Sequence, residues 1–294
     1  KMHRNEFLDL SEIKEFTSFL AELISGDEGS FTHEYKIENV GKAKNNNQWG
    51  CESIYEAFIK YRWPFNYYDH ANCLTKKGTS FYESETELGR ISHLLRRALV
   101  ANNNVEAASC CQMVLDWGGV LGSSKSGNKK KLDDLGTDLN SYLSCVKALF
   151  DSEEIGLRGQ YDVSIGGKPV PVIMNAGFTK IYSILCKDFI IYDGRVGAAL
   201  GLLVRKFLEC NSYSKEVPSS LAFHYGRARN RNVNRNPSAD RFLFPSLSTS
   251  SPAHIRSNLK ANWILQNISH NGAGQFSSLT EPLRGIEAAL FMIG

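Results

Sequence analysis

The stretch from residue 174 to residue 208 constrains the fold of this chain more than any other part of the sequence. Two apolar stripes with helical spacing follow one another within it. The first stripe consists of Phe178, Ile181, Tyr182 and Leu185, and the second of Val196, Leu200, Leu203, Val204, Phe207 and Leu208. Because both stripes advance in steps of three and four residues, the sequence predicts two helices joined by a tight connection.

Two charged residues stand at defined places on this helix pair. At about 100° per residue, Lys180 falls on the side of the first helix opposite its stripe, facing either solvent or a cleft. Asp193 directly precedes the second stripe, where its carboxylate can accept hydrogen bonds from the first free N–H groups of the helix. Gly197 and Gly201 leave a bare strip where another backbone can approach. A solvated lysine and a simple N-cap are the plain interpretations, and a catalytic pair is the alternative.

The order of these residues resembles the helix-hairpin-helix DNA glycosylases: a glycine, a lysine on a helix, a short connection, and an aspartate opening the next helix. The 8-oxoguanine-glycosylase-like bacterial branch is the most similar part of that superfamily. Asp193-Gly194-Arg195-Val196 stands where the family has Asp-x-x-Val. The resemblance implies that Lys180 attacks the sugar C1′ and that Asp193 assists loss of the base. It also implies double-stranded DNA with a modified base as the partner.

The hairpin before Lys180 departs from the family pattern. The family usually has Leu-Pro-Gly-Val-Gly, whose paired glycines let backbone amides bind a phosphate. This chain has Met174-Asn175-Ala176-Gly177-Phe178, with one glycine and no proline. By resemblance, Gly177 is the position left to contact DNA. The interval from Lys180 to Asp193 is also shorter than in the better-known members of the branch.

Positive charge is concentrated in the segment from 211 to 253, which has little periodicity. Within residues 221–242 the arginines face only Asp240, and asparagines alternate with them. Arginine and asparagine are the side chains that contact phosphates and base edges. The predicted DNA contacts are Arg195, Arg227, Arg229, Arg231 and Arg235. The alternative is a structured loop whose arginines bind carbonyls and carboxylates of the protein itself. The run from Arg235 to Ser238, together with 254–263, extends the resemblance to about residues 174–266.

Composition limits the remaining possibilities. A formal charge of +3 on 294 residues does not by itself indicate a nucleic-acid binder. No apolar run approaches the roughly 20 residues that cross a bilayer, so we expect no membrane association. The seven cysteines are scattered without a Cys-x-x-Cys pair, which argues against zinc and against an iron–sulfur cluster. We therefore expect free thiols in a reducing compartment. The glycosylase resemblance implies the bacterial cytoplasm and a reaction that needs no metal and no cofactor.

Elsewhere the pattern predicts mostly helices. Capping boxes at Asp9-x-x-Glu12, Ser53-x-x-Glu56 and Ser84-x-x-Glu87 predict three helix starts, with the second helix running to Trp63. Further helices are expected at about 105–117, 139–150 and 254–269, and after Pro282. Residues 122–131 predict a mobile basic loop, and Gly166-Gly167 predicts a β-hairpin turn. The aromatic run 55–70 predicts a helix and turn on the core, or alternatively a base-stacking surface.

The sequence thus predicts a mostly α protein: a helix-hairpin-helix glycosylase-like bundle with a minor β-hairpin. We expect one domain over 1–294, with lobes of roughly 1–150 and 151–294, and a monomer. The implied function is a DNA glycosylase that flips out and excises a modified base. By resemblance that base is oxidised guanine or, as in an anti-phage relative, glucosylated hydroxymethylcytosine. A non-catalytic nucleic-acid-binding helical protein and a protein–protein module remain alternatives.

Overall fold

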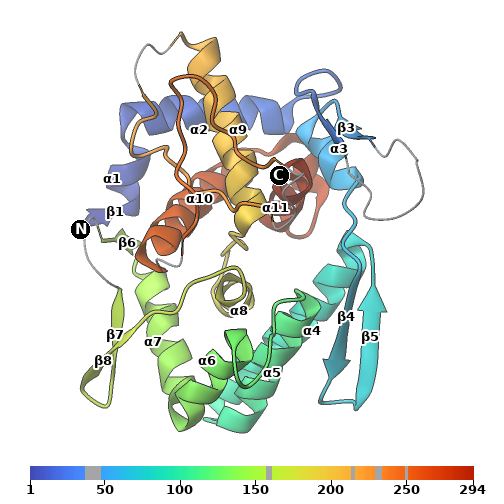
Figure 1. Cartoon of the computed structure of the whole chain (residues 1–294). Helices are drawn as coiled ribbons and strands as arrows, with labels where there is room; N and C mark the ends of the chain where they lie inside the picture. The colour runs from blue at the N-terminus through green and yellow to red at the C-terminus, as the bar shows by residue number, and fades with distance from the viewer. Residues whose placement is uncertain (37–47, 157–160, 213–215, 229–233, 249–250) are drawn as a thin grey trace. The chain divides into compact units, whose positions relative to one another are not determined.

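The chain is mostly helical, with small antiparallel strand pairs (Figure 1). The structure, a computed structural model, describes residues 1–36, 48–156, 161–212, 216–228, 234–248 and 251–294. These residues divide into two compact units. The first unit comprises 1–4, 62–191 and 249–256, and the second comprises 5–61, 192–248 and 257–294. The lobe boundary expected near residue 150 falls inside the first unit, and the expectation of a single domain stays a prediction.

The first unit is built around helix α5, Asn104–Trp117. It packs against α4 (Phe81–Val100), α7 (Leu139–Asp151), α8 (Phe178–Leu185) and strand β4 (Phe65–Asp69). Figure 1 shows α4 and α5 lying side by side. The short helix α6, Gly127–Leu135, also contacts α5.

Three antiparallel strand pairs complete the first unit. They are β4 with β5 (Leu74–Gly78), β7 (Asp162–Ile165) with β8 (Lys168–Pro171), and β1 (Met2–His3) with β6 (Glu154–Ile155). The β7–β8 hairpin turns at Gly166-Gly167 as predicted, and both glycines have positive φ. Within β4, Phe65, Tyr67 and Asp69 are buried while the residues between them are exposed, the alternation of a strand with one inward face.

In the second unit, helix α11 (Pro282–Ile293) packs against α3 (Ile54–Ile59) and α9 (Gly194–Cys210). Helix α2, Ser11–Ser25, contacts α3 and α9 as well, and Phe16 meets Phe207 with ring centroids 5.6 Å apart. Strands β2 (His33–Lys36) and β3 (Gln48–Cys51) form a hairpin. Helix α1 (Arg4–Leu8) and helix α10 (Ser251–Asn271) each contribute residues to both units.

Several predicted element boundaries are wrong for local reasons. The capping box of α4 is formed by Ser80 and Glu83, one turn before the predicted Ser84 and Glu87. Helix α2 begins after Leu10 without a side-chain cap, so the capping box at Asp9 does not form. The Ser53 cap is confirmed, but its helix ends at Ile59 and not at Trp63, and strand β4 begins at Phe65.

The predicted basic loop at 122–131 is also wrong over its second half. Residues from Gly127 onward form α6, in which Lys129 and Lys130 pair with Asp133 and Asp134 one turn later. Such i, i+4 pairs support a helix on an exposed face. The predicted helices at 105–117, 139–150, 254–269 and after Pro282 are confirmed within a few residues.

Candidate functional site

The turn that precedes α8 is stabilised by the side chain of Asn175, a residue of the turn itself. Asn175 Oδ1 accepts hydrogen bonds from the backbone N–H groups of Gly177 (2.8 Å) and Phe178 (3.1 Å). Asn175 Nδ2 donates to Asn128 Oδ1 at 3.0 Å, and Asn128 Nδ2 donates to the Val120 carbonyl at 2.7 Å. The N–H groups of Gly177 and Phe178 at the start of this helix therefore already have an acceptor within the chain.

The glycine at position 177 is required by this arrangement. A Cβ there would lie 2.1 Å from Asn128 Nδ2, a distance at which one of the two groups has to move. Gly177 is buried and has an ordinary negative φ, so close approach rather than backbone conformation explains the residue. Its expected contact with DNA stays a prediction.

A pair of tyrosines holds the segment that leads into α8. The Tyr142 and Tyr182 hydroxyls lie 3.0 Å apart. Tyr142 accepts from the Ile173 N–H at 2.8 Å, and Tyr182 donates to the Ile173 carbonyl at 2.7 Å. Burial raises the pKa of both phenols, so they serve as neutral hydrogen-bonding groups. Tyr182, which belongs to the predicted apolar stripe, thus also fixes the approach of the chain to Lys180.

Lys180 is buried, which excludes the interpretation as a solvated lysine. Only 6% of the residue is exposed, and Nζ donates to the Ala176 carbonyl, four residues back, at 2.7 Å. The side of α8 opposite its apolar stripe is covered by the end of α5: a Cβ on Gly118 would lie 2.5 Å from Lys180 Cδ. Lys180 belongs to the first unit and Asp193 to the second.

Asp193 is the N-cap of α9, as predicted. Its Oδ1 accepts from the backbone N–H groups of Arg195 (2.9 Å) and Val196 (3.1 Å). Its other oxygen, Oδ2, accepts no hydrogen bond from the residues that the structure describes. One carboxylate therefore performs the structural task with one oxygen and leaves the second oxygen available.

A second backbone crosses the start of α9. The Gly226 N–H donates to the Gly194 carbonyl at 3.0 Å, and a Cβ on Gly194 would lie 2.7 Å from the Gly226 Cα. A Cβ on Gly197 would meet the His224 carbonyl at 2.2 Å. One turn later, a Cβ on Gly201 would lie 2.5 Å from Pro237 Cγ. The prediction that Gly197 leaves room for another backbone is confirmed, whereas Gly201 makes room for a proline ring.

Two arginines lie beside this helix start. The guanidinium carbon of Arg195 lies 4.6 Å from the centroid of the Phe291 ring. Burial lowers the pKa of Arg235, and the positive charge of Arg195 lowers it further, whereas Asp193 and Tyr35 act in the opposite direction. Within the described parts of the chain, neither guanidinium makes a hydrogen bond or an ion pair. The negatively charged groups near Arg235 therefore do not offset the burial of its guanidinium and the repulsion by Arg195.

The other predicted arginines are placed less fully. Arg227 is exposed, one residue beyond the Gly194–Gly226 contact. Arg229 and Arg231 lie outside the described residues. The structure thus gathers Asp193, Arg195 and Arg235 within electrostatic range of one another, and it leaves the DNA contacts of the basic segment as predictions.

The β2–β3 hairpin adds aromatic residues that the sequence did not single out. The rings of Tyr35 and Trp49 stack with centroids 4.9 Å apart, and the Tyr35 hydroxyl donates to the Met292 carbonyl at 3.0 Å. Tyr35 is also within electrostatic range of Arg195 and Arg235. Trp49 lies in a glycine- and asparagine-rich stretch of the sequence. Its only sequence signal was a lone large aromatic at the end of that stretch.

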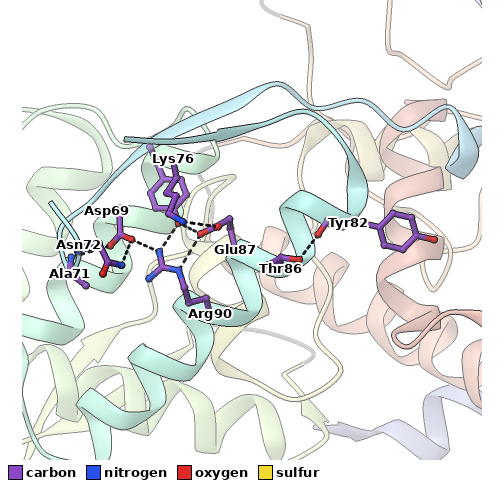
Figure 2. Close-up of polar contacts among 9 residues, drawn as sticks. Asp69, Ala71, Asn72, Lys76, Tyr82, Thr86, Glu87 and Arg90 are labelled. Atoms are coloured by element: carbon purple, nitrogen blue, oxygen red, sulfur yellow. Dashed lines mark hydrogen bonds and ion pairs between the residues drawn. The ribbon is translucent and has the colours of Figure 1, made fainter. Parts of the chain in front are cut away.

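A further polar cluster lies in the first unit, between the β4–β5 hairpin and α4. The fully buried Asp69 carboxylate binds Arg90 at 2.8 Å and accepts from Asn72 Nδ2, also at 2.8 Å. Figure 2 shows Arg90 between Asp69 and Glu87, with Lys76 reaching Glu87 from β5. Burial acts to raise the pKa of Asp69, but the Asn72 hydrogen bonds and the Arg90 charge outweigh it, and the net pKa is lowered.

The cysteines are unpaired, and two buried ones have raised pKa values. All seven cysteines are free, and burial raises the pKa of the Cys51 thiol to about 11 and that of Cys110 to about 12. Such thiols stay protonated and unreactive at neutral pH. Across the described ranges, no three His, Cys, Asp or Glu side chains are grouped as metal ligands. No helix in those ranges combines the length and hydrophobicity needed to cross a bilayer.

Comparison of the chain with protein-family models, with curated proteins and with solved structures finds no match.

Proposed function

We propose that this chain is a DNA glycosylase of the helix-hairpin-helix type that excises a modified base from double-stranded DNA. The observation that carries the proposal is the Asp193 carboxylate, which caps α9 with Oδ1 while Oδ2 stays uncommitted. Arg235 lies within electrostatic range of it, and neither the Arg195 nor the Arg235 guanidinium has a hydrogen-bond or ion-pair partner among the described residues. An acid beside two available cations suits a substrate that carries phosphates and develops positive charge on a sugar.

The chemistry assigned to Asp193 is electrostatic. Cleavage of the bond between base and sugar leaves an oxocarbenium-like sugar, and a carboxylate beside C1′ stabilises that charge. The target base has to leave the stack first, at a cost of a few kcal/mol. This reaction requires neither a metal nor another cofactor. Arg195 and Arg235 would bind the flanking phosphates, because the amides at the start of α8 are occupied by Asn175.

The role proposed for Lys180 is that of an amine nucleophile. Attack of an uncharged amine on C1′ displaces the base and, after sugar-ring opening and loss of a proton, gives a Schiff base that permits strand cleavage. The substrates proposed are oxidised guanine and glucosylated hydroxymethylcytosine, acted on by a monomer in the bacterial cytoplasm.

The test of this proposal begins with a panel of duplexes, each carrying one modified base, and measures release of free base. On the substrate that reacts, we expect Asp193→Asn to lower the rate by about 10²-fold or more, because the amide keeps the cap but loses the charge. DNA affinity should stay within a few-fold of the wild type. The matched control is Asp240→Asn, which removes the same charge from an exposed position in the basic segment.

Two outcomes would contradict the proposal. Base release by Asp193→Asn at a rate close to the wild type would remove Asp193 from the reaction. Tight binding of duplex DNA without release of any base in the panel would favour the non-catalytic nucleic-acid-binding alternative. Borohydride trapping separates the two mechanisms for Lys180: a covalent adduct that disappears in Lys180→Gln supports the nucleophile, and base release without any adduct assigns the reaction to Asp193 and water.

A further inference from the structure

The end of helix α5 carries two consecutive glycines that differ in the reason for being glycine. Gly119 has φ +63 with open space around its missing Cβ, so the left-handed backbone favours glycine there. Gly118 has φ −79 and ψ 0, a conformation open to any residue. Backbone conformation therefore does not explain why residue 118 is a glycine. The explanation lies in the atoms that surround it.

What surrounds Gly118 is the stem of Lys180. A Cβ at position 118 would lie 2.5 Å from Lys180 Cδ and 2.6 Å from Lys180 Cε. The lysine passes over the missing side chain on its way to the Ala176 carbonyl, which its Nζ meets at 2.7 Å. Both residues belong to the first unit, so this contact is internal to one compact body.

We infer that Gly118 is a positioning residue for the Lys180 amine. The Ala176 carbonyl binds Nζ, and the bare surface of Gly118 determines the path of the stem. This inference rests on the proposed function for its catalytic meaning, but its geometry is independent of any substrate. Lys180 itself is the reacting group, and Gly118 acts through it.

The size of the effect follows from contact distances. Carbon atoms pack at roughly 3.5 to 4.0 Å, so a methyl group on residue 118 forces the stem to move by about 1 Å. The lysine side chain is flexible and can yield, so the change shifts the amine rather than disrupting the fold. A misplacement of about 1 Å in a reacting group can lower a rate by about 10²-fold.

The experiment compares Gly118→Ala with Gly89→Ala. Gly89 lies within α4 of the same unit with open space around its missing Cβ, so its alanine variant controls for loss of a glycine. The first readout needs no substrate: the rate at which an amine-specific acylating reagent labels Lys180, followed by peptide mass spectrometry. We expect labelling in Gly118→Ala to be several-fold faster than in the wild type and in Gly89→Ala, because the amine leaves its hold on Ala176.

The second readout is base release and borohydride trapping on the reactive duplex. We expect Gly118→Ala to lose about 10²-fold in both, with Gly89→Ala unchanged. In a Lys180→Gln background, Gly118→Ala should have no further effect, since residues that act through one group are not additive. That non-additivity distinguishes positioning from general damage to the fold.

Each outcome decides a separate point. Unchanged labelling of Lys180 in Gly118→Ala overturns the inference, and so does faster labelling with full activity. If the wild type releases no base at all, the proposed function fails, while the labelling result still decides whether Gly118 holds the amine. If Gly118→Ala folds poorly, the thermal stability of Gly118→Ala/Lys180→Ala decides: recovery supports the contact, and no recovery contradicts it.

Discussion

The Asp69 cluster in the first unit and the Asp193 cluster in the second are made of similar side chains and differ in how these are paired. Around Asp69, Arg90 binds Asp69, Glu87 and the Tyr67 hydroxyl. Asp69 also accepts from the N–H groups of Ala71 and Asn72. Around Asp193, neither the Arg195 nor the Arg235 guanidinium makes a hydrogen bond or an ion pair within the described chain.

The pKa values of Arg90, in the Asp69 cluster, and of Arg235, in the Asp193 cluster, show the same contrast. Burial acts to lower the pKa of Arg90, but hydrogen bonds with Tyr67 and Glu87 and the charge of Asp69 outweigh it, and the net pKa is raised. For Arg235, burial and the charge of Arg195 prevail, and the net pKa is lowered. The first cluster is complete as a structural anchor for the β4–β5 hairpin. The second would be stabilised by an added anion, as expected of a site that binds phosphate.

The largest expected effect is the loss of the anchor. Replacing Arg90 by Met leaves the buried Asp69 carboxylate without its cation, and removing one partner of a buried pair costs about 3 kcal/mol or more. We expect the free energy of unfolding, measured by denaturant titration, to fall by that amount. The control is Arg97→Met: this arginine is 62% exposed and pairs with Glu106 on the surface, so its loss should cost less than about 1 kcal/mol. Equal effects of the two variants would remove the distinction between the clusters.

The second expected effect is on binding and not on stability. In the double variant Arg195→Met/Arg235→Met, methionine keeps the packing of the stems while both charges disappear. We expect the unfolding free energy to stay within about 0.5 kcal/mol of the wild type. The slope of log K for DNA against log salt should shrink by about two units, close to 0.9 for each lost phosphate contact. An unchanged slope with a loss of about 2 kcal/mol in stability would show that these arginines are structural.

The sequence predicted correctly those features whose cause lies within one short stretch of chain. The stripes of α8 and α9 and the cap at Asp193 follow from spacing within one helix, and these predictions are confirmed. The helical position of Lys180 was right, but its burial depends on Gly118 from α5, about 60 residues earlier, and no local pattern contains that contact.

The errors share a similar origin. Ser80 and Glu83 have the same spacing as Ser84 and Glu87, so the sequence offered two capping boxes one turn apart and only the packed structure selects between them. The β4–β5 hairpin was missed because its aromatic residues belong to the same aromatic run, 55–70, as α3. The alternation of Phe65, Tyr67 and Asp69 was present in the sequence as a strand signal. The Asp69 cluster could not be predicted without that hairpin.

The smallest expected effect concerns pH and separates charge from packing in the Asp69 cluster. The folded-state pKa values of Asp69 and Glu87 are lowered, so their contribution to stability is full above an unfolded pKa of about 4 and is lost as the pH falls below it. Asp69→Asn keeps the space but loses the charge. It should cost about 1 to 2 kcal/mol at pH 7, less than Arg90→Met.

Because a protonated Asp69 resembles the asparagine variant, the difference in unfolding free energy between wild type and Asp69→Asn should shrink as the pH falls from about 5 towards 2. Denaturant titrations at a series of pH values measure that difference. A gap that stays constant over this range would mean that packing, and not the ion pair with Arg90, anchors the hairpin. For Arg195→Met/Arg235→Met the gap should stay small at every pH, because no carboxylate is hydrogen-bonded to either guanidinium within the described chain.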